Sequence, residues 1–291
     1  MKVLVTGVKG QLGFDVMKEL EKRNYQAVGV DIEEMDITDQ TSVEKVLMDV
    51  RPEVVIHCAA WTAVDAAEEE ENKEKVRLVN GIGTENIAKV CSEIKAKMIY
   101  ISTDYVFDGE GIRPWEPEDE RKPLNVYGET KYEGELAVEK WLEQYFIVRI
   151  AWVFGTNGKN FIKTMLNLGK SRDRLTVVND QTGTPTYTYD LARLLVDMSE
   201  TSHYGIYHVT NTGGYISWYD FAVEIMKQAA AINPIYERVM ISPVDSSAYP
   251  VKAKRPANSR LDQSKLIQKG FKPLPSWQDA LGRYLREVEV E

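Results

Sequence analysis

The chain has 291 residues, of which 43% are hydrophobic and 28% are charged. This composition is typical of a folded globular protein and excludes a fibrous or disordered chain. The formal net charge of -9 argues against a general nucleic-acid binder, because neutralising phosphates requires a basic face. The length suits one large α/β domain or a main domain with a smaller lobe.

The two cysteines, Cys58 and Cys91, form no CxxC motif and share no metal-like spacing with the three histidines. A disulfide framework is therefore not expected. The sequence starts with a strand-like run, and no apolar stretch approaches the ~20 residues of a membrane span. We expect a cytoplasmic protein without a membrane segment.

The first element is an apolar run at residues 3–5, which a glycine turn follows at once. Gly7, Gly10 and Gly13 punctuate this turn, and Val16 and Leu20 continue it with helical spacing. Strand, glycine turn and helix together allow a close approach of the backbone to a pyrophosphate at the helix N-terminus. This stretch predicts a dinucleotide site.

A second apolar run, residues 27–30, ends in Asp31. An acid roughly 20 residues after the glycine turn can accept hydrogen bonds from the adenosine ribose. Asp31 could also be a simple strand-end turn residue, but the preceding glycine turn favours the role in cofactor binding.

Strands and amphipathic helices then alternate through the first half. A helix that Asp39 or Thr41 caps and Pro52 ends leads to a strand over 54–57, and a further helix leads to a strand over 98–102. Such repeats predict an α/β fold with a doubly wound parallel (Rossmann) sheet and its ligand at the carboxyl ends of the strands.

The last third is less regular. We expect helices near residues 191–199, 218–231 and 277–287, and a strand over 205–209 that returns to the sheet. Residues 1–150 are therefore predicted as the dinucleotide-binding domain. Residues 151–291 mainly form a smaller C-terminal substrate-binding lobe, with segments at about 186–210 returning to the main domain.

The catalytic candidates follow the strand over 98–102. Thr103 comes at its end, while Tyr127 and Lys131 share one face of a later helix at i and i+4. A nearby ammonium group would lower the pKa of the phenol and let Tyr127 exchange a proton with a carbonyl or alcohol. A tyrosine and a lysine with this spacing, found without other motifs, are more often an exposed surface pair. The glycine turn upstream favours catalysis.

With these motifs in place, the chain resembles the extended short-chain dehydrogenases/reductases, and more narrowly the dTDP-4-dehydrorhamnose reductases. The resemblance covers nearly the whole chain. It lies in residues 6–13, 59–65, 102–109, 123–131, 149–154, 180–186 and 255–262.

The resemblance implies a role for each matching residue. The expected cofactor-binding residues are Gly7, Gly10, Gln11, Leu12, Gly13, Asp31, Asp36, Ile37, Ala59, Ala60, Trp61, Tyr127 and Lys131; those facing the substrate are Thr103, Asp104, Trp152 and Arg255. Trp152 has the alternative of packing in the core, and Arg255 that of lying in a solvated basic loop over 252–256.

The resemblance also implies an activity, the NAD(P)H-dependent reduction of dTDP-4-dehydro-L-rhamnose to dTDP-L-rhamnose for cell-surface polysaccharide. Related dehydratases resemble Thr-Asp-Glu where this chain has Thr103, Asp104 and Tyr105, which argues against dehydration. Two alternatives stay open: another nucleotide-sugar reductase or epimerase, and a non-catalytic regulatory subunit similar to that of methionine adenosyltransferase.

Cofactor preference is open at this stage. Asp31 repels a 2′-phosphate and favours NADH, although Lys9 or Arg51 could reach such a phosphate. Some relatives use magnesium at a dimer contact, and Asp15 and Asp190 occupy corresponding places. Their spacing is not convincing for a metal, so we expect them to be solvated surface residues. The protein is expected to be a monomer or homodimer that binds a small-molecule substrate and neither nucleic acid nor membrane.

Overall fold

The computed structural model describes residues 1–288. Its centre is a sheet of six parallel strands in the order β2-β1-β3-β4-β5-β10. The strands are β1 (Lys2–Thr6), β2 (Gln26–Val30), β3 (Val54–His57), β4 (Lys97–Thr103), β5 (Tyr145–Ile150) and β10 (Gly205–His208). The predicted doubly wound parallel sheet is confirmed, and so is the returning strand near residue 205.

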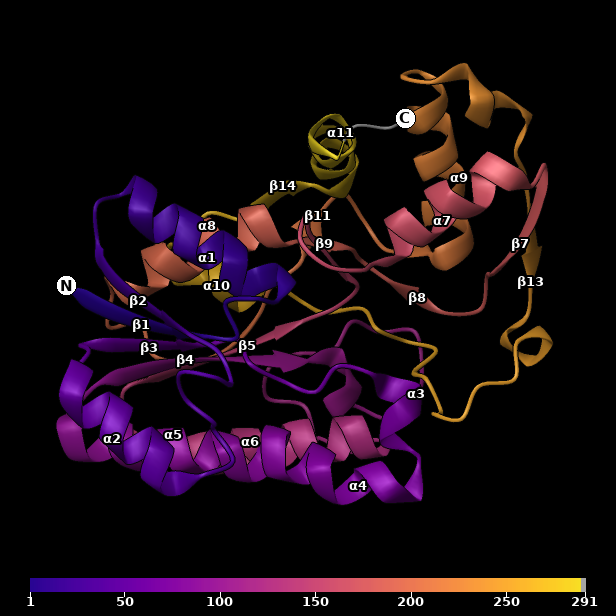
Figure 1. Ribbon diagram of the computed structural model, residues 1–291. Coiled ribbons are helices and arrows are strands. Elements are labelled where there is room, and N and C mark those ends of the chain that lie inside the picture. Colours follow the sequence, from indigo (N-terminus) through magenta and orange to yellow (C-terminus); the bar gives the residue numbers. More distant parts are fainter. Residues whose placement is uncertain (289–291) are drawn as a thin grey trace.

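Helices cover both faces of this sheet, as Figure 1 shows. One face carries α1 (Gln11–Lys22), α8 (Thr188–Ser199) and the short α10 (Ser264–Gln268); the other carries α2 (Gln40–Val50), α5 (Gly83–Ile94) and α6 (Val126–Trp141). Two short helices, α3 (Val64–Ala67) and α4 (Glu70–Arg77), and a π-helical turn over Leu78–Ile82 precede α5. Because helices shield both faces, the strands are apolar nearly throughout.

The helix starts follow from local side-chain chemistry. Asp39 caps α2 by accepting a hydrogen bond from the amide of Thr41, as one of the two predicted alternatives requires. Asn125 caps α6 by accepting from the amide of Gly128. Side-chain oxygens at these positions satisfy amide groups that have no partner inside the helix. The cap at Asn125 fixes where α6 starts, and so sets the positions of Tyr127 and Lys131.

A smaller lobe stands over the carboxyl end of the sheet (Figure 1). Its core lies between α7 (Phe161–Ser171), β7 (Arg174–Val178), α9 (Trp218–Ala230), β13 (Met240–Val244) and α11 (Trp277–Glu287). Three pairs of very short strands join the lobe to the sheet: β6 (Val153–Phe154) with β9 (Thr186–Tyr187), β8 (Thr182–Gly183) with β12 (Ile216–Ser217), and β11 (Asn211–Thr212) with β14 (Leu274–Ser276). The helices expected near 191–199, 218–231 and 277–287 are present.

Parts of the last third belong to the main sheet. Helix α8 packs against α1, and β10 pairs with β5 in parallel register. The chain therefore crosses between the two bodies several times. Within residues 1–288, no helix combines the length and the apolar character needed to cross a bilayer.

The close packing of α6 on the sheet can be tested at Gly134. A Cβ atom there would lie 2.2 Å from the phenol oxygen of Tyr100 and 2.8 Å from the carbonyl oxygen of Asn80. We expect Gly134→Ala to lower the free energy of unfolding by about 1–3 kcal/mol, because overpacking outweighs the helix propensity of alanine. Urea denaturation followed by circular dichroism measures the change.

The matched control is Gly282→Ala in α11, where the nearest atoms are the ends of two flexible side chains, Gln228 and Arg286. There alanine should leave stability unchanged or raise it by up to about 1 kcal/mol. Equal effects of the two substitutions would contradict this account of the α6 contact.

Candidate active site

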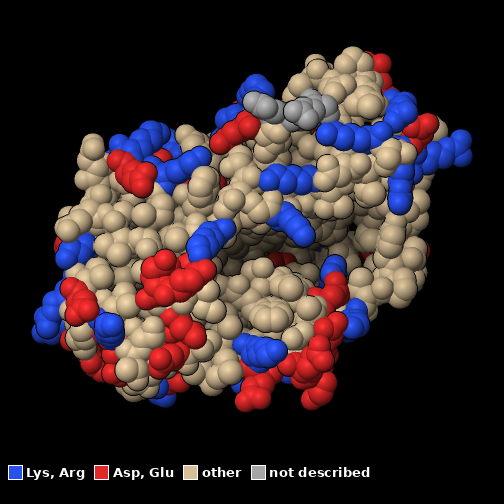
Figure 2. Space-filling model, viewed as in Figure 1, with Lys and Arg blue, Asp and Glu red and all other residues tan. Residues whose placement is uncertain are grey.

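A cleft of about 960 Å³ opens at the carboxyl ends of the parallel strands. The chain passes to β2 on one side of β1 and to β3 on the other, and this reversal of strand order is where ligands bind in open α/β sheets. Figure 2 shows the cleft as a hollow between the sheet body and the lobe, with basic and acidic side chains on its rim.

The glycine turn forms one end of the cleft. Gly7 has a φ angle of 68°, and a Cβ atom there would lie 2.7 Å from the backbone of Ala59. A Cβ atom on Gly13 would lie 2.3 Å from the carbonyl oxygen of Gly7. Since the N-cap, Gly10, has no side chain, the first amide groups of α1 keep their hydrogens for a ligand. This cradle fits a pyrophosphate.

The adjacent wall is acidic. The Asp31 carboxylate accepts a hydrogen bond from the amide of Lys9 at 3.0 Å and another from the amide of Ile32. The Lys9 ammonium group pairs with Glu33 at 2.6 Å. Of the two cations considered for a 2′-phosphate, Lys9 lines the cleft, whereas Arg51 lies at the C-terminus of α2, outside the lining.

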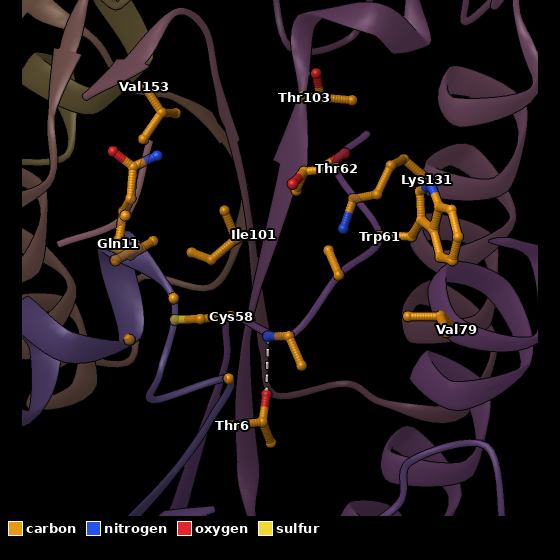
Figure 3. Close-up of a pocket in the computed structure, with 18 of the residues that line it drawn as sticks. Thr6, Gln11, Cys58, Trp61, Thr62, Val79, Ile101, Thr103, Lys131 and Val153 are labelled. Carbon is orange, nitrogen blue, oxygen red and sulfur yellow. Dashed lines mark hydrogen bonds between the residues drawn. The ribbon is translucent and has the colours of Figure 1, made fainter. Parts of the chain in front are cut away.

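Backbone hydrogen bonds shape the middle of the cleft. The amide of Ala59 donates to the Thr6 hydroxyl at 3.1 Å, and the amide of Trp61 donates to the Asn80 side chain at 2.8 Å. In Figure 3, Trp61 and Lys131 form one wall, Gln11 and Val153 the opposite wall. These two hydrogen bonds fix the backbone of residues 59–61 along the cleft.

Tyr127 lies in the first turn of α6, and its ring packs edge-on against Tyr105 at 5.5 Å between centroids. Burial raises the pKa of Tyr127 to about 12, and hydrogen bonding to Thr103 offsets this only in part. The prediction that Lys131 lowers this pKa is wrong, because loss of hydration is the largest effect on the phenol and the carboxylate of Asp104 raises the pKa further. Tyr127 is consequently protonated at neutral pH.

Lys131 is 3% exposed. Its ammonium nitrogen lies over the Tyr100 ring, 4.1 Å from the ring centroid. Burial lowers the pKa of Lys131 to about 7, while the carboxylate of Glu135 works in the opposite direction. Its charge is therefore poised near physiological pH.

Asp104 follows Thr103 at the end of β4 and is 2% exposed. One carboxylate oxygen accepts a hydrogen bond from the Thr103 hydroxyl at 3.1 Å. Burial raises the pKa of Asp104 to about 6, and the hydroxyl groups of Ser259 and Thr103 lower it in part. A carboxyl group in this setting can accept a hydrogen bond from a sugar hydroxyl.

Trp152 has a φ angle of 51°, an unusual conformation for a large side chain. Its ring stacks on Trp218 with 3.8 Å between centroids and an interplanar angle of 15°. A Cβ atom on Gly183 would lie 2.9 Å from the Trp152 ring, so glycine leaves the space that this ring needs. The strained backbone presents a flat apolar face to the cleft.

The cleft brings together nearly all the predicted residues. Its lining includes Gly7, Gly10, Gln11, Leu12, Gly13, Asp31, Asp36, Ile37, Ala59, Ala60, Trp61, Thr103, Asp104, Tyr127, Lys131 and Trp152. Arg255 lies outside this lining, where its guanidinium group donates to Asp65 at 2.5 Å. Its contact with substrate stays a prediction.

Sequence reasoning missed the contribution of the loop between β6 and α7. Gly158 and Lys159 of this loop line the cleft. The Gln11 side chain accepts hydrogen bonds from the amide of Gly155 at 3.0 Å and from Asn160 at 3.1 Å. Gly155 and Asn160 lie 144 and 149 positions after Gln11 in the sequence. No local motif indicates that this loop contacts the glycine turn.

The expectation for Asp15 and Asp190 is wrong, since both are buried rather than solvated. Asp15 accepts a hydrogen bond from the Thr188 hydroxyl at 2.5 Å, while Asp190 pairs with Arg283 at 2.6 Å. Residues 1–288 contain no group of three or more side chains that could hold a metal ion.

Three comparisons place the chain among known proteins. The family model described as "RmlD substrate binding domain" matches residues 1–290. The dTDP-4-dehydrorhamnose reductase of Aggregatibacter actinomycetemcomitans is 40% identical over 288 residues, covering 96% of this chain and 97% of the relative.

Two solved structures are also similar over nearly their full length. A dTDP-4-dehydrorhamnose reductase from Clostridium acetobutylicum has a TM-score of 0.94 and 41% identity, with 99% of this chain and 100% of that chain covered. The Bacillus anthracis enzyme of the same name, in complex with NADP, has a TM-score of 0.92 and 39% identity, with coverages of 98% and 99%.

Proposed function

The chain belongs to the RmlD family of dTDP-4-dehydrorhamnose reductases, and we propose that its cleft reduces the C4 ketone of dTDP-4-dehydro-L-rhamnose in the following way. The observation that carries the proposal is a half-buried, protonated Tyr127 on α6, which lies beside the buried Thr103 at the carboxyl end of β4. A ketone oxygen placed between these two hydroxyl groups would meet two hydrogen-bond donors once the Thr103 hydroxyl turns from Asp104, to which it donates in the structure.

When bound, a reduced nicotinamide supplies the hydride that adds to C4 of the ketone. The Tyr127 hydroxyl gives its proton to the oxygen that becomes an alcohol, and solvent returns a proton to the phenolate afterwards. The Thr103 hydroxyl stabilises the charge that develops on that oxygen. A pKa of about 12 keeps Tyr127 protonated, which suits reduction because the residue must act as an acid.

The remaining residues bind and orient. Lys131 and Trp61 would hold the nicotinamide ribose, and the first amide groups of α1 would hold the pyrophosphate. Asp104 would accept a hydrogen bond from the sugar, whose apolar face would pack on Trp152. Arg255 would reach the diphosphate of the substrate after leaving Asp65.

Two observations favour reduction over the alternatives. Tyr105 occupies the place of the glutamate that dehydration would need, and burial raises its pKa well above the ordinary range, so it cannot act as a base at neutral pH. A purely regulatory protein would not require Thr103, Tyr127 and Lys131 together in one cleft.

The proposal is tested with Tyr127→Phe. Purified protein should oxidise the reduced cofactor when dTDP-4-dehydro-L-rhamnose is added, and the substitution should lower kcat by about 10²–10⁴-fold, as for loss of a general acid. The loss of absorbance at the nicotinamide band follows the reaction. Dinucleotide affinity, measured by fluorescence, is the control; because Tyr127 is also an expected cofactor-binding residue, the affinity should fall, but by far less than kcat. Full activity of Tyr127→Phe would contradict the assigned role, and failure of the unmodified protein to oxidise any cofactor would favour a regulatory subunit.

The acidic wall favours NADH over NADPH. Three carboxylates, Asp31, Glu33 and Glu34, follow β2, and Glu33 already pairs with Lys9, the cation that lines this part of the cleft. A 2′-phosphate would bring about two further negative charges to this place, where repulsion would weaken binding. A 2′-phosphate would therefore have to compete with Glu33 for the ammonium group of Lys9.

We expect kcat/KM to be higher with NADH than with NADPH. Glu33→Gln should raise kcat/KM for NADPH by about 2- to 10-fold and leave the NADH value nearly unchanged, because it frees Lys9 and removes one negative charge. Glu21→Gln, on the exposed side of α1, makes the same change in net charge elsewhere and should alter neither value. An equal change for both cofactors in Glu33→Gln, or a preference of the unmodified protein for NADPH, would contradict this assignment.

A further inference from the structure

A buried charge cluster lies directly behind the cleft; its charged members Glu135, Arg149 and Arg121 lie outside the cleft lining, and Ser102 belongs to that lining. The Glu135 carboxylate accepts hydrogen bonds from the Ser102 hydroxyl at 2.5 Å and from the Arg149 guanidinium group at 2.8 Å to each oxygen. Arg121 donates a further hydrogen bond at 3.0 Å. Glu135 and Arg149 are both fully buried.

The partners of Glu135 join the elements that carry the reaction. Ser102 immediately precedes Thr103 in β4, and Glu135 follows Lys131 by one turn of α6. Residues four apart on a helix share a face, so the carboxylate and the ammonium group face the same side of α6. One carboxylate therefore links the strand end with Thr103 to the helix with Tyr127 and Lys131.

The cluster also reaches the segment that runs under the lobe. Arg149 donates a hydrogen bond to the carbonyl oxygen of Pro117 at 2.9 Å and lies 3.3 Å from His208. The other ring nitrogen of His208 lies 2.9 Å from the carbonyl oxygen of Trp115. Trp115 in turn bonds to the segment at residues 258–262.

Such a cluster is a poor device for stability alone. Taking a carboxylate and a guanidinium group out of water costs several kcal/mol per ion, and apolar residues of similar volume often serve the fold as well. The hydrogen-bonded geometry instead fixes one arrangement of β4, β5 and α6. The cost of burying these ions is consistent with a need for a negative charge at the position of Glu135.

Lys131 is the group that such a charge would serve. The titratable groups facing it are His57 at the end of β3, Cys58 directly after β3, Tyr100 on β4, and Glu135 on its own helix. Burial lowers the pKa of His57 to about 3 and raises that of Cys58 to about 12, and Tyr100 also stays neutral. Of these four groups, Glu135 is the one that is negative at neutral pH.

We propose that Glu135 is a positioning residue, whose carboxylate keeps Lys131 charged in the buried cleft and holds the Thr103 strand end against α6. The proposal rests on the proposed reductase function and adds a residue that does not touch substrate or cofactor. Charge on Lys131 matters because an ammonium group donates to the ribose hydroxyls with all three hydrogens.

The sign of the effect on pH dependence follows from the charges. Activity that needs cationic Lys131 is complete below the pKa of this group and falls as pH rises through about 7. Removing the negative charge of Glu135 disfavours the cationic form further, so the fall must move to lower pH. Tyr127 does not cause this fall, because its pKa of about 12 lies far higher.

The test compares Glu135→Gln with the unmodified protein in profiles of kcat/KM against pH. We expect the alkaline limb to move down by about one pH unit. Glu139→Gln is the matched control. Glu139 also lies on α6 and pairs with Arg121, but it is one turn farther from Lys131. Its limb should stay in place. An unmoved limb in folded Glu135→Gln would overturn the proposal.

Two further variants keep the proposal testable if Glu135→Gln does not fold. Glu135→Asp retains the charge and should keep the limb at its original pH, while kcat falls because the hydrogen bonds lengthen. Ser102→Ala removes one hydrogen bond without a change in charge and should lower kcat several-fold with no shift of the limb. A shifted limb in Glu135→Asp, or unchanged kcat in Ser102→Ala, would overturn the proposal.

Dinucleotide affinity, measured by fluorescence over the same pH range, separates this proposal from the proposed function. If the unmodified protein binds NADH but reduces no sugar, the reductase function fails. The affinity of Glu135→Gln should still weaken at a lower pH than that of the unmodified protein. If it does not, the role of Glu135 fails as well.

Discussion

The close packing at the first turn is the constraint on which the rest of the structure depends. The turn after β1, the start of α1 and the end of β3 meet where Gly7 and Gly13 leave no room for a Cβ atom. This contact brings the free amide groups of α1 next to Ala59 and the middle of the cleft. Larger residues would separate α1 from the sheet, and the pyrophosphate cradle would be lost with it.

The same turn joins the two bodies of the molecule. Gln11, inside the turn, bonds to Gly155 and Asn160, and Asn157 donates to the carbonyl oxygen of Lys9 at 2.8 Å. The loop that enters the lobe is therefore built on the cofactor turn. Because Trp152 precedes this loop, its strained backbone is anchored on one side by β5 and on the other by the glycine turn.

Sequence patterns predicted what is local. Periodicity predicted the strands of the sheet and the helices that cover it. Of the seventeen site residues predicted from the motifs that resemble the reductase family, sixteen line the cleft and Arg255 does not. They did not predict burial. Asp15 and Asp190 are acids on helices with charged neighbours, yet the contact of α1 with α8 and the pairing with Arg283 bury both. Contacts between distant segments decide such cases.

Burial also explains why spacing misled the interpretation of Tyr127 and Lys131. The i and i+4 pattern implies that the ammonium group acts on the phenol, but hydration lost by both groups dominates their pKa values in a cleft this deep. A pKa of about 12 keeps the phenol protonated at neutral pH, as a proton donor requires. Burial has the opposite consequence for Lys131, because it disfavours the charged form of the ammonium group. The carboxylate of Glu135, one turn along α6, can favour the charged form of Lys131 from outside the cleft lining.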